Sequence, residues 1–89
     1  KLDIMTKAQT LGITSFPYII RDERGNVVYK EFSDNTWYIQ KFDSEDNVIY
    51  CESSSGYWFK QEFQSKINRV YFENSYGYIS DHRPHIEIN

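Results

Sequence analysis

Histidines, the cysteine and clustered acids are the residues of this sequence that could support catalysis or bind a metal ion. His82 and His85 form an H-x-x-H pair with Asp81 and Glu87 nearby, a spacing that can hold a metal. However, Pro84 separates the two histidines, and no further histidine or neighbouring cysteine supplies the remaining ligands of a structural zinc site. We therefore interpret this segment as an exposed tail.

Neither the cysteine nor the acidic cluster matches a known reactive pattern. Cys51 falls in a predicted strand on an apolar face, where a free thiol acts as a small apolar side chain. The spacing of Asp43, Glu45 and Asp46 matches no EF-hand loop and indicates a hairpin tip. No glycine-rich phosphate loop is present. The sequence thus predicts a protein without catalytic residues, cofactor or metal site.

Aromatic and acidic residues recur with a period of 21 residues. Residues 38–58 and 59–79 are identical at nine of 21 ungapped positions. The period aligns like residues in up to three copies, namely Asn26/Asn47/Asn68, Tyr29/Tyr50/Tyr71, Glu31/Glu52/Glu73, Ser33/Ser54/Ser75 and Trp37/Trp58. A fixed period of this length is typical of repeat architectures, in which each unit packs on its neighbours.

The repeated rings and acids form the candidate binding site. It comprises Tyr29, Glu31, Trp37, Tyr50, Glu52, Trp58, Tyr71 and Glu73. Rings with acids beside them suit a cationic or protein partner. The same residues also fit a purely structural role, because cross-strand pairs stabilise a sheet by ~0.2–1 kcal/mol each. The sequence leaves both roles open.

Composition and turn residues predict a mainly β (α+β) fold to position these side chains. Helix formers are scarce, with one Ala and two Leu, whereas 34 of 89 residues are Ile, Val, Tyr, Phe, Trp or Thr. Turn-forming residues recur about every ten positions, at 22–26, 34–35, 43–47, 55–56, 64–68 and 76–77. We expect about seven antiparallel strands in a meander built from three 21-residue β-hairpin repeats.

Residues 1–89 are interpreted as a single domain with three parts. Residues 1–15 are a short N-terminal helix and linker, residues 16–79 are the three β repeats, and residues 80–89 are a C-terminal tail. The helix is expected from Lys1 to Leu11, with Ile4, Ala8 and Leu11 on one side and Gly12 as its stop signal.

Alternation along the strands divides the predicted sheet into two faces. Pairing Phe42 with Ile49, and Phe63 with Val70, gives an apolar face of Tyr38, Gln40, Phe42, Ile49, Cys51, Phe59, Gln61, Phe63, Val70 and Phe72. The opposite face, here called the tyrosine face, carries Trp37, Ile39, Lys41, Tyr50, Glu52, Trp58, Lys60, Glu62, Tyr71 and Glu73. This pairing sets Lys60 opposite Glu73.

The two faces are expected to meet different partners. The tyrosine face suits a partner that brings Arg or Lys to its acids and rings, because an isolated carboxylate is costly to bury. The apolar face is expected to meet the helix or a second subunit. A helix of about ten residues is only ~15 Å long and cannot cover a sheet about 30 Å wide.

Charge and hydropathy argue against two classes of partner. The net charge of −3 argues against nucleic acid, whose binding proteins normally carry a basic stripe. No apolar run approaches the ~18 residues of a membrane helix, so no membrane partner is expected. Cys51 is the only cysteine, which excludes an internal disulfide and argues against a disulfide-stabilised secreted domain.

The repeat resembles that of a known group of proteins. Residues 57–63 (YWFKQEF) and 68–79 (NRVYFENSYGYI) resemble tandem GYWxKxEYDxxGNxIYxENSxG units of small bacteriophage and bacterial proteins, akin to YD-type β repeats. Residues 7–13, 16–18 and 81–84 resemble the two ends of such phage proteins. Asp46, Gln64 and Ile67 depart from the Asp and Gly of the repeat pattern, so the turns they occupy are expected to be longer or looser.

The resemblance implies a phage-type protein that acts in the cytoplasm of a bacterial host. The expected function is non-catalytic protein binding, as an inhibitor of a host defence protein, with a host or self protein as partner and a homo-oligomer as one form. One alternative is an aromatic-repeat module that binds choline or carbohydrate, because such repeats share a rhythm of about 20 residues. A purely structural repeat domain is the other alternative.

Overall fold

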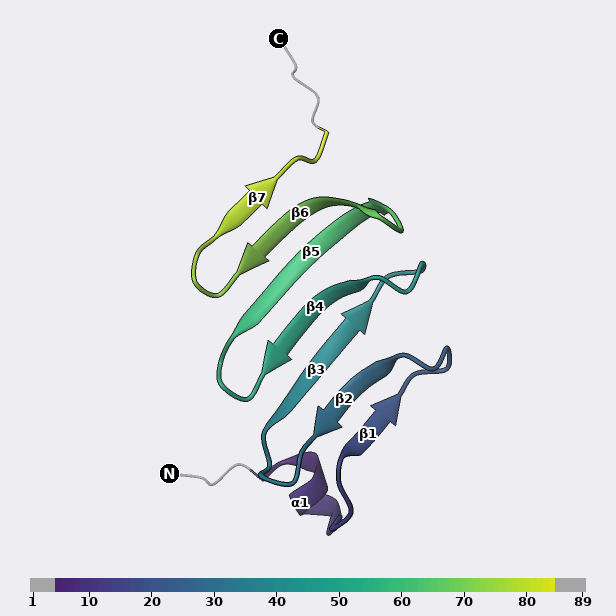
Figure 1. The fold of residues 1–89 in the computed structure, drawn as a ribbon, viewed down its shortest axis with the longest axis vertical. Helices are drawn as coiled ribbons and strands as arrows, with labels where there is room; N and C mark the ends of the chain where they lie inside the picture. Colours follow the sequence, from purple (N-terminus) through teal and green to yellow (C-terminus); the bar gives the residue numbers. More distant parts are fainter. Residues whose placement is uncertain (1–4, 85–89) are drawn as a thin grey trace.

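The computed structural model describes residues 5–84, and within them the chain forms one short helix followed by one antiparallel sheet (Figure 1). The seven strands lie in sequence order, so each pairs only with its neighbours along the chain. The elements are α1 (Lys7–Leu11), β1 (Tyr18–Arg21), β2 (Val27–Glu31), β3 (Trp37–Phe42), β4 (Val48–Ser53), β5 (Trp58–Ser65), β6 (Asn68–Asn74) and β7 (Ile79–Asp81). A mainly β fold with a seven-strand antiparallel meander and a short helix is thereby confirmed.

Asp, Asn and Gly residues form most of the turns between the strands. The carboxylate of Asp22 accepts hydrogen bonds from the backbone N–H groups two and four residues later, both at 2.9 Å. Asp43 makes the same two bonds at 2.9 and 3.0 Å. Five turns contain one residue with positive φ, a conformation that Gly, Asn and Asp tolerate best. These residues are Gly25, Asn35, Asp46, Gly56 and Gly77.

The turn between β5 and β6 has a different construction. Ile67 occupies the position at which Gly25 and Asp46 have positive φ, and its own φ is not positive. A β-branched side chain is strained in the left-handed region, so the strands extend instead to Ser65 and Asn68. The expectation of longer or looser turns is therefore wrong. This turn is shorter, and Asp46, with φ of 66°, lies in the positive-φ region like the corresponding Gly25, with φ of 87°.

The strand register agrees with the predicted pairing along most of its length. Lys60 lies opposite Glu73, and their Nζ and Oε1 atoms are 3.6 Å apart. Near the β3–β4 turn the register shifts, so that Phe42 faces Val48 instead of the expected Ile49. A corresponding shift occurs between β5 and β6. Such bulges place an extra residue on one strand and increase the local twist, a detail that alternation alone does not reveal.

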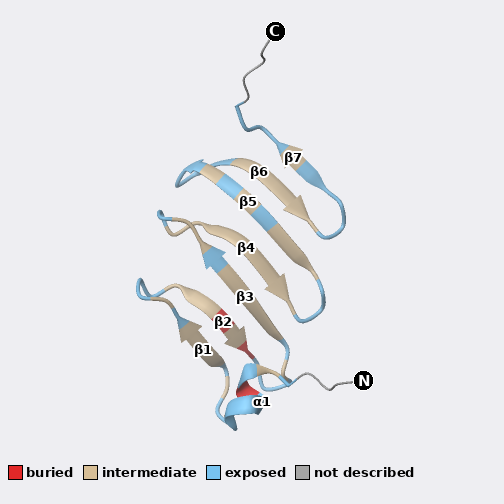
Figure 2. Cartoon of the chain, turned by 180° about the vertical axis from the view of Figure 1, so that it is seen from behind, coloured by how far each residue is buried: buried red, intermediate tan, exposed pale blue. Residues whose placement is uncertain are grey.

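The sheet is a single layer with almost no interior. The molecule measures 58 × 34 × 17 Å, and its smallest extent leaves room for one sheet and its side chains. Among the described residues, Ala8, Tyr29 and Glu31 are the ones that are fully buried, and Figure 2 shows them together where α1 meets β2. Most other strand residues are half-buried. Both faces of the sheet are therefore largely open beyond β2.

The helix is shorter than expected and starts at a defined cap. The Thr6 hydroxyl accepts a hydrogen bond from Gln9 N (3.1 Å), and Gln9 Oε1 accepts one from Thr6 N (2.9 Å), which is a capping box. Gly12 ends the helix with φ of 71°. Ala8 is buried as expected, whereas Leu11 is 62% exposed. Residues 1–4, which include part of the predicted helix, lie outside the described region.

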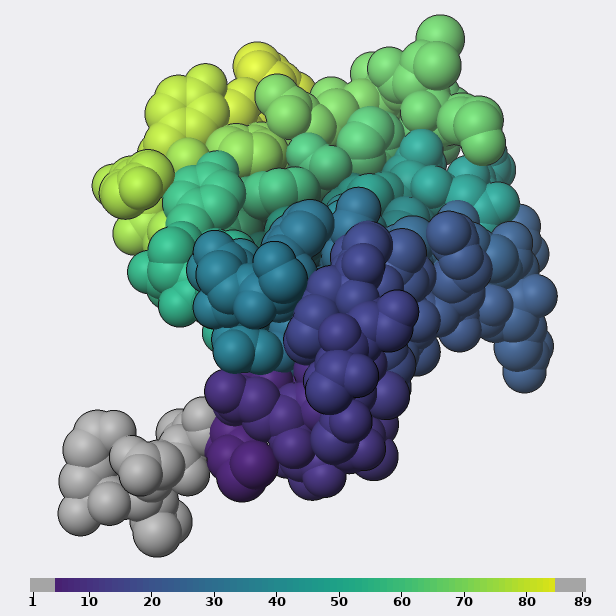
Figure 3. All heavy atoms as spheres, turned by 60° about the horizontal axis from the view of Figure 1, so that its bottom comes forward, coloured from purple at the N-terminus to yellow at the C-terminus, as the bar shows by residue number. Residues whose placement is uncertain are grey.

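The helix also covers a different face from the one expected. Figures 1 and 3 place α1 at the β1–β2 end of the sheet. There, Lys7 lies over the ring of Tyr29, and the backbone N–H of Ala8 donates to Glu31. Tyr29 and Glu31 pair with Ile39 and Trp37, which belong to the tyrosine face. The helix is thus held to this face by the ionised Glu31, and the apolar face receives no helix from the described chain.

Candidate binding surface

Three tyrosine–glutamate pairs lie on the tyrosine face, one on each of β2, β4 and β6. The two residues of a pair are two positions apart on one strand, so their side chains share a face. The tyrosine hydroxyl donates to glutamate Oε1 in Tyr29–Glu31 (2.8 Å), Tyr50–Glu52 (2.9 Å) and Tyr71–Glu73 (2.8 Å). This hydrogen bond, together with burial, raises the pKa of Tyr50 and of Tyr71.

The first pair is buried beneath α1, with Glu31 0% and Tyr29 5% exposed. Glu31 Oε1 accepts hydrogen bonds from the Tyr29 hydroxyl and from Ala8 N (3.0 Å). Glu31 Oε2 accepts from Asn35 Nδ2 (2.8 Å) and from the Thr6 hydroxyl. Burial alone would raise the pKa of Glu31, but the four hydrogen bonds together lower it to about 2. The buried carboxylate is therefore ionised and anchors the helix.

The buried position of Glu31 differs from the expectation that the acids of this face remain exposed. An isolated carboxylate is costly to bury, but one with four donors is not isolated. Tyr29 is enclosed in the same way, because Trp37 stacks on its ring at 6.2 Å between centroids and Lys7 Nζ lies 5.5 Å from that ring. Burial, with the hydrogen bond to Glu31, raises the pKa of Tyr29 to about 12. In this structure Tyr29 and Glu31 are thus enclosed by residues of their own chain and are not exposed to a partner.

The other two pairs are not covered by the helix, and they lie on β4 and β6 with Trp58 between them on β5. Each ring in this region has a cation of the same chain nearby. Lys41 Nζ is 5.7 Å from the Tyr50 ring centroid, Lys60 Nζ is 5.9 Å from that of Trp58, and Arg83 Cζ is 4.1 Å from that of Tyr71. The sequence leads us to expect such cations from a partner, but the chain itself supplies them here.

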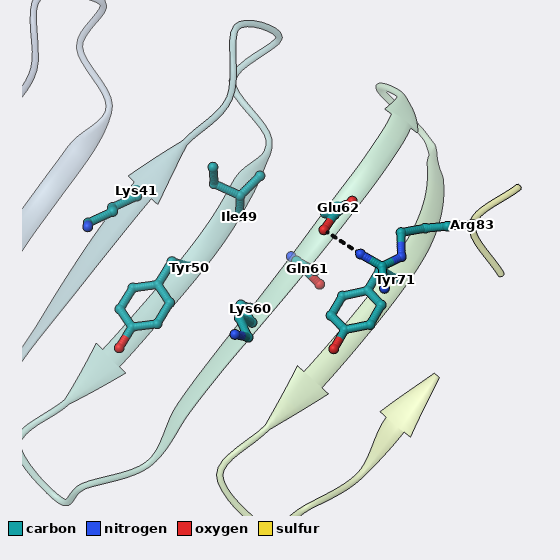
Figure 4. Close-up of a pocket in the computed structure, with 8 residues that line it drawn as sticks. All are labelled: Lys41, Ile49, Tyr50, Lys60, Gln61, Glu62, Tyr71 and Arg83. Carbon is teal, nitrogen blue, oxygen red and sulfur yellow. Dashed lines mark hydrogen bonds and ion pairs between the residues drawn. The ribbon is translucent and has the colours of Figure 1, made fainter. Parts of the chain in front are cut away.

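A groove of about 390 Å³ runs between the two uncovered tyrosines (Figure 4). Cross-strand pairing places Tyr50 between Lys41 and Lys60. The groove is lined by Lys41, Ile49, Tyr50, Lys60, Gln61, Glu62, Tyr71 and Arg83. Ile49 was expected on the apolar face, but the register shift next to the β3–β4 turn leaves it without a cross-strand partner, and it borders this groove instead. Both charge signs and two rings therefore meet in one shallow depression, which suits contact with a polar surface better than enclosure of a small molecule.

Arg83 is the surface residue that the sequence analysis missed, because it was assigned to the tail. Its guanidinium donates to Glu62 Oε2 at 3.0 Å and to both carboxylate oxygens of Asp81 at 2.9 and 2.8 Å. These bonds hold the pKa of Asp81 at about 2. Continuing the two-residue alternation past position 79 would have placed Asp81 and Arg83 on the tyrosine face with Tyr71.

The remaining candidates carry no site in the described part of the chain. No group of three potential metal ligands occurs within residues 5–84, and His82 is exposed, while His85 and Glu87 lie outside that range. Cys51 is half-buried on the apolar face, and burial raises the pKa of its thiol. None of the helices among residues 5–84 is long and apolar enough to cross a membrane.

Comparison with known proteins yields no relative from which a function could be transferred. No family model, curated protein or solved structure matches this chain. The function is therefore inferred from the residues of the surface.

Proposed function

We propose that the protein is a non-catalytic binding protein that recognises another protein through the uncovered part of its tyrosine face. The proposed contact residues are Tyr50, Glu52, Trp58, Tyr71 and Glu73, with Trp37 at the margin next to the helix. The observation that carries this proposal is the cluster of half-buried rings and charges on β4–β6, over which the described part of the chain places no second layer. Tyr, Trp and Arg are the residues that most often dominate protein–protein binding energy.

The charge pattern of this surface favours a protein over a small ligand. Glu52 and Glu73 are fixed by their tyrosines, while Lys41 and Lys60 flank Tyr50, so a partner meets both signs within one patch. Patterned charge of this kind selects for a partner of complementary pattern and fixes its orientation. A groove open along its length exposes these groups to an extended surface.

The resemblance to phage proteins supports one class of partner. We infer a bacterial host protein in the cytoplasm, such as a defence component, that is inhibited when the tyrosine face covers it. In this proposal three 21-residue hairpin units supply the face, and the tyrosine–glutamate hydrogen bond that recurs at positions 29, 50 and 71 supports it. The unit under the helix secures the N-terminal segment, and the next two present the binding surface.

The alternative of a choline-binding or carbohydrate-binding module has weaker support. A choline headgroup binds over aromatic faces as a cation. The rings of Tyr50, Trp58 and Tyr71 already have Lys41, Lys60 and Arg83 over or beside them. A cationic ligand would have to displace these groups and would meet their like charge. A choline or glycan array with the intact chain tests this alternative directly.

The double variant Tyr50→Ala/Glu52→Lys tests the proposed surface. We expect it to remain folded but to bind a host protein captured by the wild-type chain at least tenfold more weakly, because it loses one ring and reverses one charge at the centre of the patch. Affinity capture from host lysate followed by titration of the captured protein measures this change.

A matched control carries the same charge reversal away from the surface. Glu45→Lys changes an exposed residue at the β3–β4 hairpin tip and should bind as the wild type does. Equal binding by the double variant and the wild type would contradict the proposed surface. A double variant that loses its far-ultraviolet circular dichroism would assign the tyrosine–glutamate pairs a structural role instead.

A further inference from the structure

The apolar face of the sheet is an extended hydrophobic surface that no part of residues 5–84 covers. Phe59 and Phe72 stack at 5.7 Å between ring centroids, and Tyr57 and Tyr78 pack against them at 6.3 and 5.9 Å. Phe32 and Tyr38 form a second ring pair, toward the β2 side. The half-buried Cys51 lies directly opposite Phe59 and belongs to the same patch. In the described chain, α1 lies on the opposite face.

The two glutamines of the apolar face are already paired within the sheet. Gln40 Nε2 donates to the Val27 carbonyl at 2.8 Å, and Gln61 Nε2 donates to the Val48 carbonyl at 2.7 Å. Each side chain therefore reaches a backbone carbonyl of another strand, and its Nε2 group needs no hydrogen-bond acceptor from water or from a partner protein. The glutamates of β2–β6 all belong to the tyrosine face, as the strand register shows.

The cations of the apolar face lie toward its two sides. Lys30 on β2 has its Nζ 5.2 Å from the Phe32 ring, and Arg69 on β6 has its Cζ 4.7 Å from the Phe72 ring. The residues that β4 and β5 themselves contribute to this face are uncharged, and the Arg69 guanidinium reaches β5 at the Gln61 Oε1 atom, 3.3 Å away. An uncharged centre with charged groups at its margin is the usual composition of a protein–protein interface.

We propose that the apolar face packs against the same face of a second copy of this chain, so that two single-layer sheets form a two-layer sandwich. Seven strands about 4.8 Å apart and about 20 Å long give a face of about 600 Å² in plan. Two copies would bury about 1,200 Å² together, which is the lower end of the range for specific interfaces. The area therefore suffices for a reversible dimer.

A second copy also matches the shape of this face. Stacked sheets pack well when their strands run within about 30° of each other, an angle set by the twist of both sheets. Two copies of one sheet have the same twist, so their strands can cross at this angle. The dimer leaves the tyrosine faces on its two outer sides. The inference is thus independent of the proposed host partner.

Sedimentation equilibrium tests this inference on the intact chain. We expect twice the monomer mass at high concentration and dissociation on dilution, within about 1 mM to about 1 µM. Phe59→Lys places a charge at the centre of the face and should weaken association at least tenfold. Ser44→Lys adds the same charge at an exposed residue of the β3–β4 turn, away from the apolar face, and should associate as the wild type does.

Two further measurements keep the test decisive if Phe59→Lys fails to fold. Tyr78→Lys changes a ring that is 58% exposed at the margin of the face and should weaken the dimer with little effect on folding. The thiol of wild-type Cys51 should react with a maleimide at least fivefold more slowly at dimer concentrations than after dilution. A monomer at every concentration, or a Cys51 reaction rate independent of concentration, would overturn the proposal.

Discussion

Glu31 connects the helix to the sheet, and its hydrogen bonds make stability depend on pH. Its pKa is lowered to about 2 in the folded chain, against 4.5 for an ordinary glutamate. A lowered folded-state pKa stabilises the fold above the unfolded pKa, and this contribution is lost as the pH falls from about 5 to about 2. A difference of this size corresponds to a contribution on the order of 3 kcal/mol. Urea unfolding at pH 7, 5 and 3 should show the loss.

Glu31→Gln separates this residue from the other acids of the chain. The amide keeps the shape but removes the charge, so the variant should be less stable at pH 7 and should lose less stability than the wild type on acidification. Glu52→Gln is the matched control, because its pair is half-buried and has no helix above it. An identical pH dependence for wild type and Glu31→Gln would show that Glu31 does not anchor α1.

At the scale of elements, two turns that lie 21 residues apart and share a residue with positive φ should contribute equally to the free energy of unfolding. Gly56 and Gly77 have φ of 95° and 89°, with no atom near the position of an added Cβ. Alanine at either position should therefore cost about 1–2 kcal/mol through backbone strain alone. Ser44→Ala, in an exposed turn, should change the free energy of unfolding by less than about 0.5 kcal/mol. Clearly unequal costs in denaturant titrations would show that the two turns are not equivalent.

The strands and turns were predictable because their signals are local. Alternation, β-branched residues and the Asp, Asn and Gly positions fix each hairpin without reference to distant contacts, and they gave the cross-strand pair of Lys60 with Glu73. The placement of the helix was not predictable in this way. It depends on Glu31 accepting hydrogen bonds from Thr6 and Ala8, more than 20 residues away, and buried carboxylates are uncommon enough that exposure was the natural expectation.

The candidate surface was predictable only in part, because it too depends on contacts between residues that are far apart in the sequence. The repeat identified its tyrosines, tryptophans and glutamates, but the period could not show that α1 would cover Tyr29 and Glu31. Nor did it show Arg83, which reaches Tyr71 from beyond β7. The Ile67 turn was mispredicted because a change of residue type was taken to loosen the turn, whereas the strands extended to avoid a strained φ.

At the scale of the whole molecule, the sheet should tolerate loss of one internal unit. Each strand pairs only with its sequence neighbours, so deletion of residues 38–58 leaves Trp37 followed by Phe59, which occupies the place of Tyr38 in the 21-residue period. We expect a shorter sheet with a lower melting temperature and a β-type circular dichroism spectrum. A fully unfolded deletion variant would indicate that the stability of the sheet depends on more than contacts between adjacent units.

The most direct test of the central claim, that the tyrosine face binds a protein partner, is hydroxyl-radical footprinting of the chain with and without its captured partner. Oxidation reports the solvent exposure of individual aromatic side chains, and the two faces present different rings. The account predicts that binding protects Tyr50, Trp58 and Tyr71 while Phe59 and Phe72 keep the rates that they have in the free chain. Protection confined to Phe59 and Phe72, with Tyr50 and Tyr71 unchanged, would contradict it.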